Sequence, residues 1–319
     1  FEKGYFGNSG AEANEAAIKL ARKWGYLNGA EKDSNGNSKR RIIYTLESSF
    51  HGRTMATLTA TGQDKFHPAY FAPYVEGFKT IKANDWEAIK TAFDDTTAAL
   101  MIECIQGEGG VNLIDSEWAK AAAEAAHKAG AIVIADEVQT GVGRTGTYLA
   151  SQWLGFNPDV VTLAKGIAGG IPMGACLFRG KAADVFVAGD HQSTFAGNPL
   201  ACAAGLEVIR ALETPGFYDR VNKAGDFIRD TIRKWNNPLV VDVRGKGLMI
   251  GTQIVPEVKP FDIEVACEFH STGVVDGLSL YHGLCESIGR SLLAEDNCEL
   301  LVAPVGLSRD SYLVGFSCL

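Results

Sequence analysis

The alternation of short apolar runs with longer helical stretches constrains the fold of this chain most strongly. The runs have the apolar, β-branched composition of buried strands, and they cover residues 41–46, 98–103, 131–135, 160–164 and 174–178. Between them, apolar residues recur every three or four positions, as on one face of an α-helix. This alternation predicts an α/β fold in which helices flank a mainly parallel central sheet.

The length of the chain predicts more than one domain. With 319 residues, 46% of them hydrophobic, it can bury a large core and form one large domain with a smaller C-terminal α+β domain. A helix predicted at about 198–212 is broken by the Thr-Pro-Gly sequence at 214–216, so the predicted domains are residues 1–214 and 215–319. The apolar residues of 255–319 follow no clear period, and no elements are assigned there.

Composition and charge exclude several classes of function. The net charge of -8 and the pI near 5.3 argue against non-specific binding to nucleic acid. No apolar stretch has the length of a membrane span and no signal peptide is visible, so we expect a cytoplasmic protein. The seven cysteines are scattered and form no C-x-x-C, which favours reduced thiols over disulfides. The histidines are also scattered and suggest no metal site.

The first predicted helix starts close to the beginning of the chain. Ser9 and Glu12 have the S-x-x-E spacing of a capping box, and no strand is predicted before them. The unpaired N–H groups and positive dipole of a helix start favour an anion, and the small residues Gly10 and Ala11 would let a phosphate approach. Plain N-capping by Ser9 is the alternative. The predicted apolar face of this helix comprises Ala13, Ala16, Ala17, Leu20, Trp24 and Leu27.

Two charged residues each close a predicted strand. Asp136 follows the run 131–135, and Lys165 follows the run 160–164. Residues at the ends of neighbouring parallel strands can meet at one ligand. Pyridoxal 5'-phosphate (PLP) needs such a pair: a lysine that binds its aldehyde, and a carboxylate that keeps the pyridine nitrogen protonated. Taken alone, both residues could equally be solvated ends of strands.

A glycine-rich segment offers a rival interpretation. Residues 141–146 satisfy the G-x-G-x-x-G pattern of dinucleotide-binding proteins. However, residues 136–140 separate the first glycine from the strand, and the helix predicted at 148–154 is short for a crossover. A nucleotide-binding oxidoreductase is therefore the main alternative from another class of enzyme.

Two carboxylate pairs suggest other chemistry with less support. Asp136 and Glu137 resemble a Walker B pair, but the chain contains no G-x-x-x-x-G-K-[ST] phosphate loop. Glu103 and Glu108 flank a glycine-rich turn and could suggest glycoside hydrolysis. Sequence spacing does not give the distance between their carboxylates, which that reaction requires.

Six sequence blocks occur in an order that resembles a known enzyme family. They are NSGAEANE at 8–15, SFHGRT at 49–54, ECIQGEGG at 103–110, DEVQTGVGRTG at 136–146, TLAKG at 162–166 and HQSTFAGNPLA at 191–201. Together they resemble the class III, fold-type I aminotransferases, most closely the acetylornithine aminotransferases. The resemblance extends from Phe6 to about Ile254 and is poor beyond it. In that family several dozen residues precede the first block, so we expect an N-terminally truncated fragment with an atypical tail.

The resemblance assigns residues to the cofactor, PLP. It implies that Lys165 binds PLP covalently and then acts as the catalytic base, while Asp136 holds the proton on the pyridine nitrogen. Val138 packs beneath the ring, Phe50 lies on the cofactor face, and Gln139 donates to the phenolic oxygen. The implied phosphate ligands are Ser9, Gly10, Ala11 and, across the interface of a homodimer with shared active sites, Thr194.

For the substrate, the resemblance implies three further residues. Arg53 binds a substrate carboxylate, which suits a planar guanidinium with paired donors. Glu108 acts as a gate that helps decide whether an amine-bearing side chain or a dicarboxylate is held. Ser193 belongs to the loop that crosses to the partner subunit. Cys104 replaces a proline that is usual in the family, and this is expected to loosen the turn.

The reaction implied by the resemblance moves the terminal amino group of N-acetylornithine to 2-oxoglutarate. It gives N-acetylglutamate semialdehyde and glutamate in arginine biosynthesis. Within the family, ornithine, succinylornithine or 4-aminobutyrate could replace N-acetylornithine, and an inactive binding module on the same fold is a third interpretation. An arginine that the family carries in its small domain has no match, because Glu299 or Leu300 stands at its place. Weak binding of PLP or slow turnover of glutamate is therefore expected.

Overall fold

The computed structural model describes residues 1–255, 300–304 and 312–318, with side chains described in the first of these ranges. The chain divides into two compact units: residues 1–107 with 113–218, and residues 108–112 with 219–319. The domain boundary placed after residue 214 stays a prediction, and the sequence gives no sign that the short segment 108–112 groups with the second unit.

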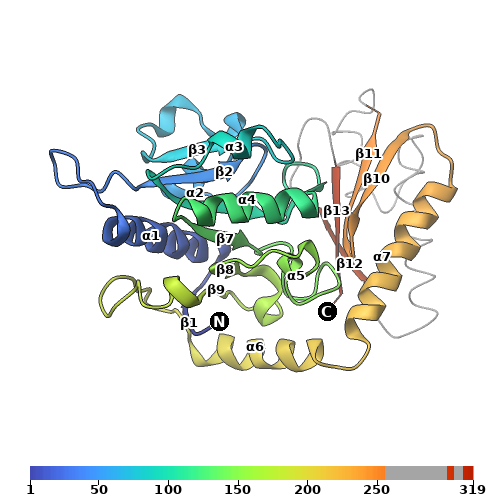
Figure 1. The fold of residues 1–319 in the computed structure, drawn as a ribbon. Helices are drawn as coiled ribbons and strands as arrows, with labels where there is room; N and C mark the ends of the chain where they lie inside the picture. Colours follow the sequence, from blue (N-terminus) through green and yellow to red (C-terminus); the bar gives the residue numbers. More distant parts are fainter. Residues whose placement is uncertain (256–299, 305–311, 319) are drawn as a thin grey trace. The chain divides into compact units, whose positions relative to one another are not determined.

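A seven-stranded sheet forms the centre of the first unit (Figure 1). In the order of the sheet, its strands are β1 (Lys3–Gly7), β9 (Gly174–Phe178), β8 (Val160–Leu163), β7 (Ile132–Asp136), β4 (Thr97–Glu103), β2 (Ile42–Leu46) and β3 (Phe78–Ile81). β9 is antiparallel to β1 and β8, and the other neighbours are parallel. The predicted α/β fold with a mainly parallel sheet is confirmed, and each predicted run forms a strand.

The prediction of no strand before the first helix is wrong, because Lys3–Gly7 forms β1. Both β1 and β3 are edge strands, and most of their residues are exposed or only partly buried. They therefore lack the continuous apolar run that marks a strand covered on both faces. Every residue of β4, β7 and β8 is buried, which explains why these central strands could be predicted.

Helices connect the strands of this unit. The α-helices are α1 (Gly10–Asn28), α2 (Met55–Ala60), α3 (Ala88–Thr91), α4 (Ser116–Lys128), α5 (Ala150–Leu154) and α6 (Pro199–Leu212). The short elements are the 3-10 helices η1 (Asp64–Phe66), η2 (Ala69–Phe71), η3 (Lys165–Ala168) and η4 (Gly180–Ala182), and strands β5 (Ile105–Gln106) and β6 (Asn112–Leu113). The predicted apolar face of α1 is confirmed as far as Leu20. It is partly exposed at Trp24 and wrong at Leu27, which is 58% exposed.

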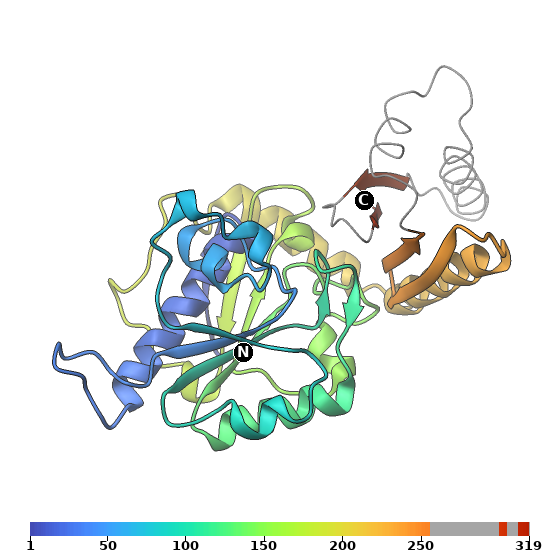
Figure 2. The same ribbon diagram turned by 90° about the horizontal axis from the view of Figure 1, so that it is seen from above.

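The two faces of the sheet carry separate apolar cores. Along β4, Ala99 and Met101 pack with residues of α1, whereas Leu100 and Ile102 pack with residues of α4. This alternation follows from the two-residue period of a strand. Figure 2 shows α1 (blue) and α4 (green) on opposite sides of the sheet. Helices therefore cover both faces of the central strands.

The second unit contains most of α7 (Phe217–Lys234) and a four-stranded antiparallel sheet. In order, the strands are β10 (Val240–Lys246), β11 (Met249–Ile254), β13 (Tyr312–Cys318) and β12 (Leu300–Pro304). Ile228 and Ile232 of α7 form its core with Val243 and Ile250. Two strands thus lie in the tail, where no element was assigned. Leu300 begins β12, whereas Glu299 lies outside the described residues.

Candidate active site

The carboxyl ends of β4, β7 and β8 meet at one edge of the sheet. The register pairs Glu103 with Asp136 and Asp136 with Thr162, and Lys165 begins η3 just after β8. β1 is parallel to β8, because both are antiparallel to β9, so Gly7 leads into the start of α1 at the same edge. Open α/β sheets bind ligands at this edge. The structure therefore places the two predicted residues, Asp136 and Lys165, at the same edge of the sheet.

Small residues allow close packing around the start of α1. A Cβ atom at Gly10 would lie 2.7 Å from Val138 Cγ1, and one at Gly174 would lie 2.2 Å from the Ser9 carbonyl oxygen. Ser9 is the N-cap residue, and its Oγ accepts a hydrogen bond from the Glu12 N–H at 3.2 Å. The free N–H groups that a helix start presents, together with its dipole, favour an anion here.

The predicted capping box is only half present. Glu12 accepts hydrogen bonds from the backbone N–H of Asn8 and from its side-chain amide, the latter at 2.9 Å, rather than from the Ser9 N–H. The Asn8 amide also donates to Ser193 Oγ at 3.0 Å. Ser193 therefore lies beside the start of α1, whereas the adjacent Thr194 is exposed. A role for Thr194 in a partner subunit stays a prediction.

Asp136 belongs to a buried network of hydrogen bonds. Its Oδ2 atom lies 2.7 Å from both Asn14 Nδ2 and His51 Nδ1. Its Oδ1 atom accepts from the Val138 N–H at 3.1 Å and from the Thr162 hydroxyl at 3.4 Å. Asp136, His51 and Asn14 are each at most 4% exposed. The carboxylate is thus held in one orientation at the edge of the sheet.

Sequence reasoning assigns no role to Asn14 or His51, although one signal was available. Asn14 is a buried amide on α1, where the other buried residues are apolar or glycine, such as Ala13 and Ala17. A buried polar side chain on an apolar face requires a hydrogen-bond partner. The identity of that partner could not be predicted, because Asn14 and Asp136 are 122 positions apart in the sequence.

Lys165 has an uncommon backbone conformation. Its φ of +48° lies in the left-handed region, which residues other than glycine rarely adopt. The residue is exposed at the sheet edge. Strained backbone positions persist where the surrounding structure fixes them, and they cluster at functional sites. The conformation supports a functional role for Lys165 independently of the sequence motif.

A buried carboxylate fixes the loop that follows β7. Glu137 is fully buried and accepts hydrogen bonds from the Thr140 hydroxyl at 2.5 Å and from the Ala150 and Ser151 N–H groups at 2.9 and 2.7 Å. Cys104 Sγ lies 3.6 Å from the same carboxylate. Burial, reinforced by this negative charge, raises the pKa of the Cys104 thiol well above its usual value. The cysteine at the usual proline position therefore adds a contact to a turn that was expected to be looser.

The glycine-rich turn after β7 is explained by packing. A Cβ atom at Gly141 would lie 2.6 Å from Leu163 Cδ2 and 2.7 Å from the Glu137 carbonyl oxygen. Gly143 and Gly146 have φ values of +83° and +86°, which favour glycine. The helix that follows, α5, has only 5 residues, against the longer crossover helix of a dinucleotide-binding unit. These glycines need no bound nucleotide to account for them.

Arg53 is supported by two aromatic rings. The centre of its guanidinium lies 4.4 Å from the ring centroid of Phe66 and 5.4 Å from that of Phe50. The two rings contact each other edge to face, with centroids 5.6 Å apart. The Phe50 N–H donates to Glu103 Oε2 at 2.7 Å, which fixes the start of this segment to the end of β4. Arg53 is exposed, so its guanidinium can reach a soluble anion.

Lysines of α1 hold the loop that carries Ser193. Lys23 Nζ lies 2.5 Å from Asp190 Oδ2, and Lys19 Nζ donates to the Asp190 carbonyl oxygen at 2.7 Å. His191 stacks on Phe186 and lies 3.0 Å from Lys19 Nζ. The loop is therefore fixed to α1 by one partly buried ring and two cations.

Acid is expected to loosen this loop. Burial, followed by the charge of Lys19, lowers the pKa of His191 from 6.5, and Glu15 and Glu12 oppose this shift. Because the folded state then binds fewer protons than the unfolded state, the contribution of His191 to stability is complete above pH 6.5 and is lost as the pH falls toward the lowered pKa. Urea unfolding at about pH 7.5 and pH 5 should show a larger loss for the wild type than for His191→Phe. Equal losses would contradict this assignment.

Glu108, the predicted gate, belongs to the second unit. In that unit the Arg244 guanidinium donates twice to the Gly110 carbonyl oxygen, at 2.8 and 2.6 Å. This contact fixes the turn that carries Glu108, while the gating role stays a prediction. In the described part of the chain, no cluster of His, Cys, Asp and Glu could hold a metal ion, and no helix is long and apolar enough to span a membrane.

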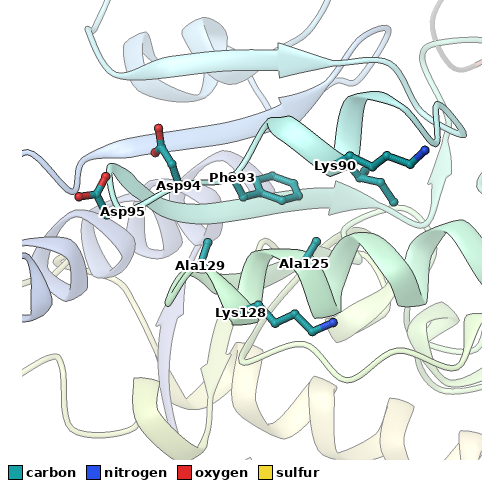
Figure 3. A pocket seen from close by; sticks show the side chains of 8 residues that line it. Lys90, Phe93, Asp94, Asp95, Ala125, Lys128 and Ala129 are labelled. Atoms are coloured by element: carbon teal, nitrogen blue, oxygen red, sulfur yellow. The ribbon is translucent and has the colours of Figure 1, made fainter.

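A surface groove of about 600 Å³ lies between α3 and α4 (Figure 3). Lys90 and Lys128 lie toward one end of it and Asp94 and Asp95 toward the other. Both aspartates precede the start of β4, so this end of the groove lies near the amino end of that strand. None of the predicted site residues lines the groove, so it is separate from the candidate site.

Comparisons with known proteins agree with this geometry. The family model described as aminotransferase class-III matches residues 2–280. The acetylornithine aminotransferase of Caldanaerobacter subterraneus subsp. tengcongensis is 42% identical over 303 residues, which are 93% of this chain and 73% of that protein. The acetylornithine aminotransferase 1 of Bordetella pertussis is 45% identical over 253 residues, which are 78% of this chain and 62% of that protein.

A solved structure of the ornithine aminotransferase from Toxoplasma gondii, in which PLP partly occupies the active site, is also similar. It has a TM-score of 0.76 and 31% identity, and the match covers 84% of this chain and 63% of that chain. The chain thus spans between 62% and 73% of the length of the two curated relatives. The family match also passes Ile254, where the resemblance was expected to end. The oxidoreductase interpretation is therefore wrong, and the chain belongs to the class III aminotransferases.

Proposed function

We propose that this chain binds PLP at the edge formed by β7, β8 and the start of α1. The observation that carries the proposal is the buried Asp136 carboxylate at the end of β7, with Lys165 just after the neighbouring strand. When bound, PLP supplies an electron sink for the carbanion that forms when the substrate loses a proton. Asp136 would hold the positive charge on the pyridine nitrogen, and Lys165 would bind the aldehyde carbon.

The residues at this edge fit the cofactor. Two buried atoms of the Asp136 network, Asn14 Oδ1 and His51 Nε2, have no hydrogen-bond partner among the described residues. Both atoms can therefore still form a hydrogen bond. The start of α1, with the small residues Gly10 and Ala11 after Ser9, suits the dianionic phosphate. Val138 and Phe50 would pack against the ring of PLP, and Gln139 would donate to its phenolic oxygen. Thr194 of a second subunit would bind the phosphate.

The chain's own groups divide the work of the reaction. Lys165 Nζ would take the proton from the substrate carbon that bears the amine, acting as a general base. Arg53 would bind a substrate carboxylate through paired N–H donors, held in place by the Phe50 and Phe66 rings. Ser193 would contact the substrate, and Glu108 would act as the gate.

We further propose N-acetylornithine and 2-oxoglutarate as substrates, with N-acetylglutamate semialdehyde and glutamate as products of a step in arginine biosynthesis. The support is the agreement of two curated relatives, which are both acetylornithine aminotransferases at 42% and 45% identity. Ornithine, succinylornithine and 4-aminobutyrate are the competing amino donors. A cytoplasmic location is part of this proposal.

Competition between amino donors tests the substrate. The PLP-loaded chain would be given each of the four donors with 2-oxoglutarate, and glutamate would be measured. The expected result is the highest kcat/KM for N-acetylornithine, since specificity is a ratio of kcat/KM values. A higher value for another donor would reassign the substrate within the family. Absence of glutamate with every donor would support the inactive binding module instead.

A homodimer with shared sites is also proposed, and exposed apolar residues of the first unit support it. Phe195 is 73% exposed, and on α6 Leu200, Leu206 and Ile209 are 68%, 55% and 40% exposed. Large exposed apolar side chains gathered along one segment mark an interaction surface. This segment directly follows Thr194, the predicted contact to the phosphate of the second subunit.

Mixing two inactive variants tests the shared site. In a mixed dimer of Lys165→Ala and Thr194→Glu chains, one site combines the intact lysine of one chain with the intact threonine of the other. Random pairing of equal amounts should restore about a quarter of wild-type activity, since half of the dimers are mixed and each has one intact site. Lys165→Ala mixed with the double variant is the control, because it can form no intact site. Recovery equal to that control would contradict sharing.

A further inference from the structure

We propose that His51 and Asn14 are positioning residues that fix the Asp136 carboxylate for PLP. The inference rests on the proposed PLP site and adds to it the two groups through which Asp136 is oriented. Neither side chain is assigned contact with substrate or cofactor. Each would act only through Asp136.

The geometry at Asp136 Oδ2 carries this inference. Asn14 Nδ2 and His51 Nδ1 approach the same oxygen, each at 2.7 Å, whereas the two donors to Oδ1 are longer, at 3.1 and 3.4 Å. An ionised carboxylate only accepts hydrogen bonds, so Nδ1 of His51 carries the proton in this arrangement. Two short bonds to a charged acceptor make Oδ2 the fixed end of the carboxylate.

The two donors are themselves fixed by the surrounding structure. The Asn14 amide also donates to the His51 carbonyl oxygen at 2.7 Å, and the His51 N–H donates to Thr61 Oγ1 at 3.0 Å. Hydrogen bonds therefore join each pair of the three residues Asn14, His51 and Asp136. They come from α1, from the segment before α2 and from β7.

This set connects two parts of the proposed cofactor site. Asn14 is one turn into α1, the helix whose start is proposed to bind the phosphate. Its amide fixes the carboxylate proposed to face the ring. Through Asn14, the spacing between the phosphate site and the carboxylate is set before PLP binds. Such preorganisation by outer groups raises affinity without direct contact with the ligand.

A double-mutant cycle on PLP affinity tests the inference. Apoprotein would be titrated with PLP and followed by protein fluorescence, for the wild type, His51→Phe, Asn14→Leu, Asp136→Ala and each pair with Asp136→Ala. Phe and Leu preserve volume but remove the donor. In the chain with Asp136, each substitution is expected to raise the Kd of PLP about tenfold, the effect of losing a hydrogen bond to a charged group. In the Asp136→Ala chain the same substitution should change the Kd less than about twofold.

Matched controls separate positioning from stability. His127→Phe removes another histidine–carboxylate contact of the same unit, His127 Nε2 to Asp159 Oδ2 at 2.8 Å, and should leave the Kd unchanged. His51→Asn, whose amide can replace the Nδ1–H donor, should recover part of the affinity and serves if His51→Phe does not fold. Thermal unfolding of each apoprotein is measured alongside, because a purely structural role would lower the midpoint without coupling to Asp136.

The outcomes are distinguishable. A larger rise in the Kd of PLP in the chain with Asp136 than in the Asp136→Ala chain, with an unchanged Kd for His127→Phe, supports positioning through Asp136. Equal effects in both backgrounds, or normal affinity after both substitutions, would overturn this inference and leave the proposed function intact. A wild-type chain that does not bind PLP would overturn both.

Discussion

The Lys165→Ala variant is expected to lose about 10⁴-fold in kcat, because alanine cannot act as the base that moves the substrate proton. Other residues supply the start of α1 and the four donors to Asp136 described above, so PLP should still bind non-covalently. Single-turnover measurements with the amino donor would give the rate of proton removal directly. Added methylamine should restore part of that rate, since a small amine can supply the missing base.

The control for this loss is Lys128→Ala, which removes a lysine from the groove between α3 and α4, a groove that no predicted site residue lines. Its kcat is expected to stay near that of the wild type. A Lys165→Ala chain that retains more than about a tenth of wild-type kcat would place the base elsewhere, because a positioned base contributes about 10²-fold or more.

The Asp136→Asn variant is expected to lose about 10³-fold in kcat, equivalent to about 4 kcal/mol in the barrier. An amide carries no negative charge, so it cannot hold the proton on the pyridine nitrogen that makes the ring an electron sink. It still accepts a hydrogen bond from His51 or Asn14, so the fold of this edge should be preserved. Stopped-flow rates of the amino-donor half-reaction check the size of the loss.

Asp159→Asn is the matched control for this substitution. Asp159 also contacts a histidine, but it precedes β8 at the other end of the strand. Its replacement should affect stability more than turnover. Near-normal turnover of Asp136→Asn would refute the role assigned to that carboxylate.

The sequence predicted the centre of the fold better than its edges. β4, β7 and β8 are buried along their whole length, so composition alone marks them as strands. β1 and β3 are edge strands with exposed residues, and their short runs cannot be told from loops. Leu27 fits the helical period of α1 yet is 58% exposed. It lies in the last turn of the helix, where the apolar face is no longer covered.

The candidate site shows the same limit. Asp136 and Lys165 could be predicted because each follows an apolar run, and parallel strands bring such ends together. Their supporting groups could not, because these contacts are set by tertiary structure. Asn14 and His51 are 122 and 85 positions from Asp136. The Cys104 thiol contacts Glu137, which is 33 positions away in the sequence. The family resemblance implied only a looser turn at Cys104.

Chemical trapping of the cofactor lysine tests the central claim most directly. Borohydride reduction of the PLP-loaded chain would make the bond between PLP and its lysine irreversible, and peptide mapping by mass spectrometry would locate the modified residue. We expect a pyridoxyl group on Lys165, in the peptide that contains TLAKG. A pyridoxyl group on another lysine, or on none, would contradict it.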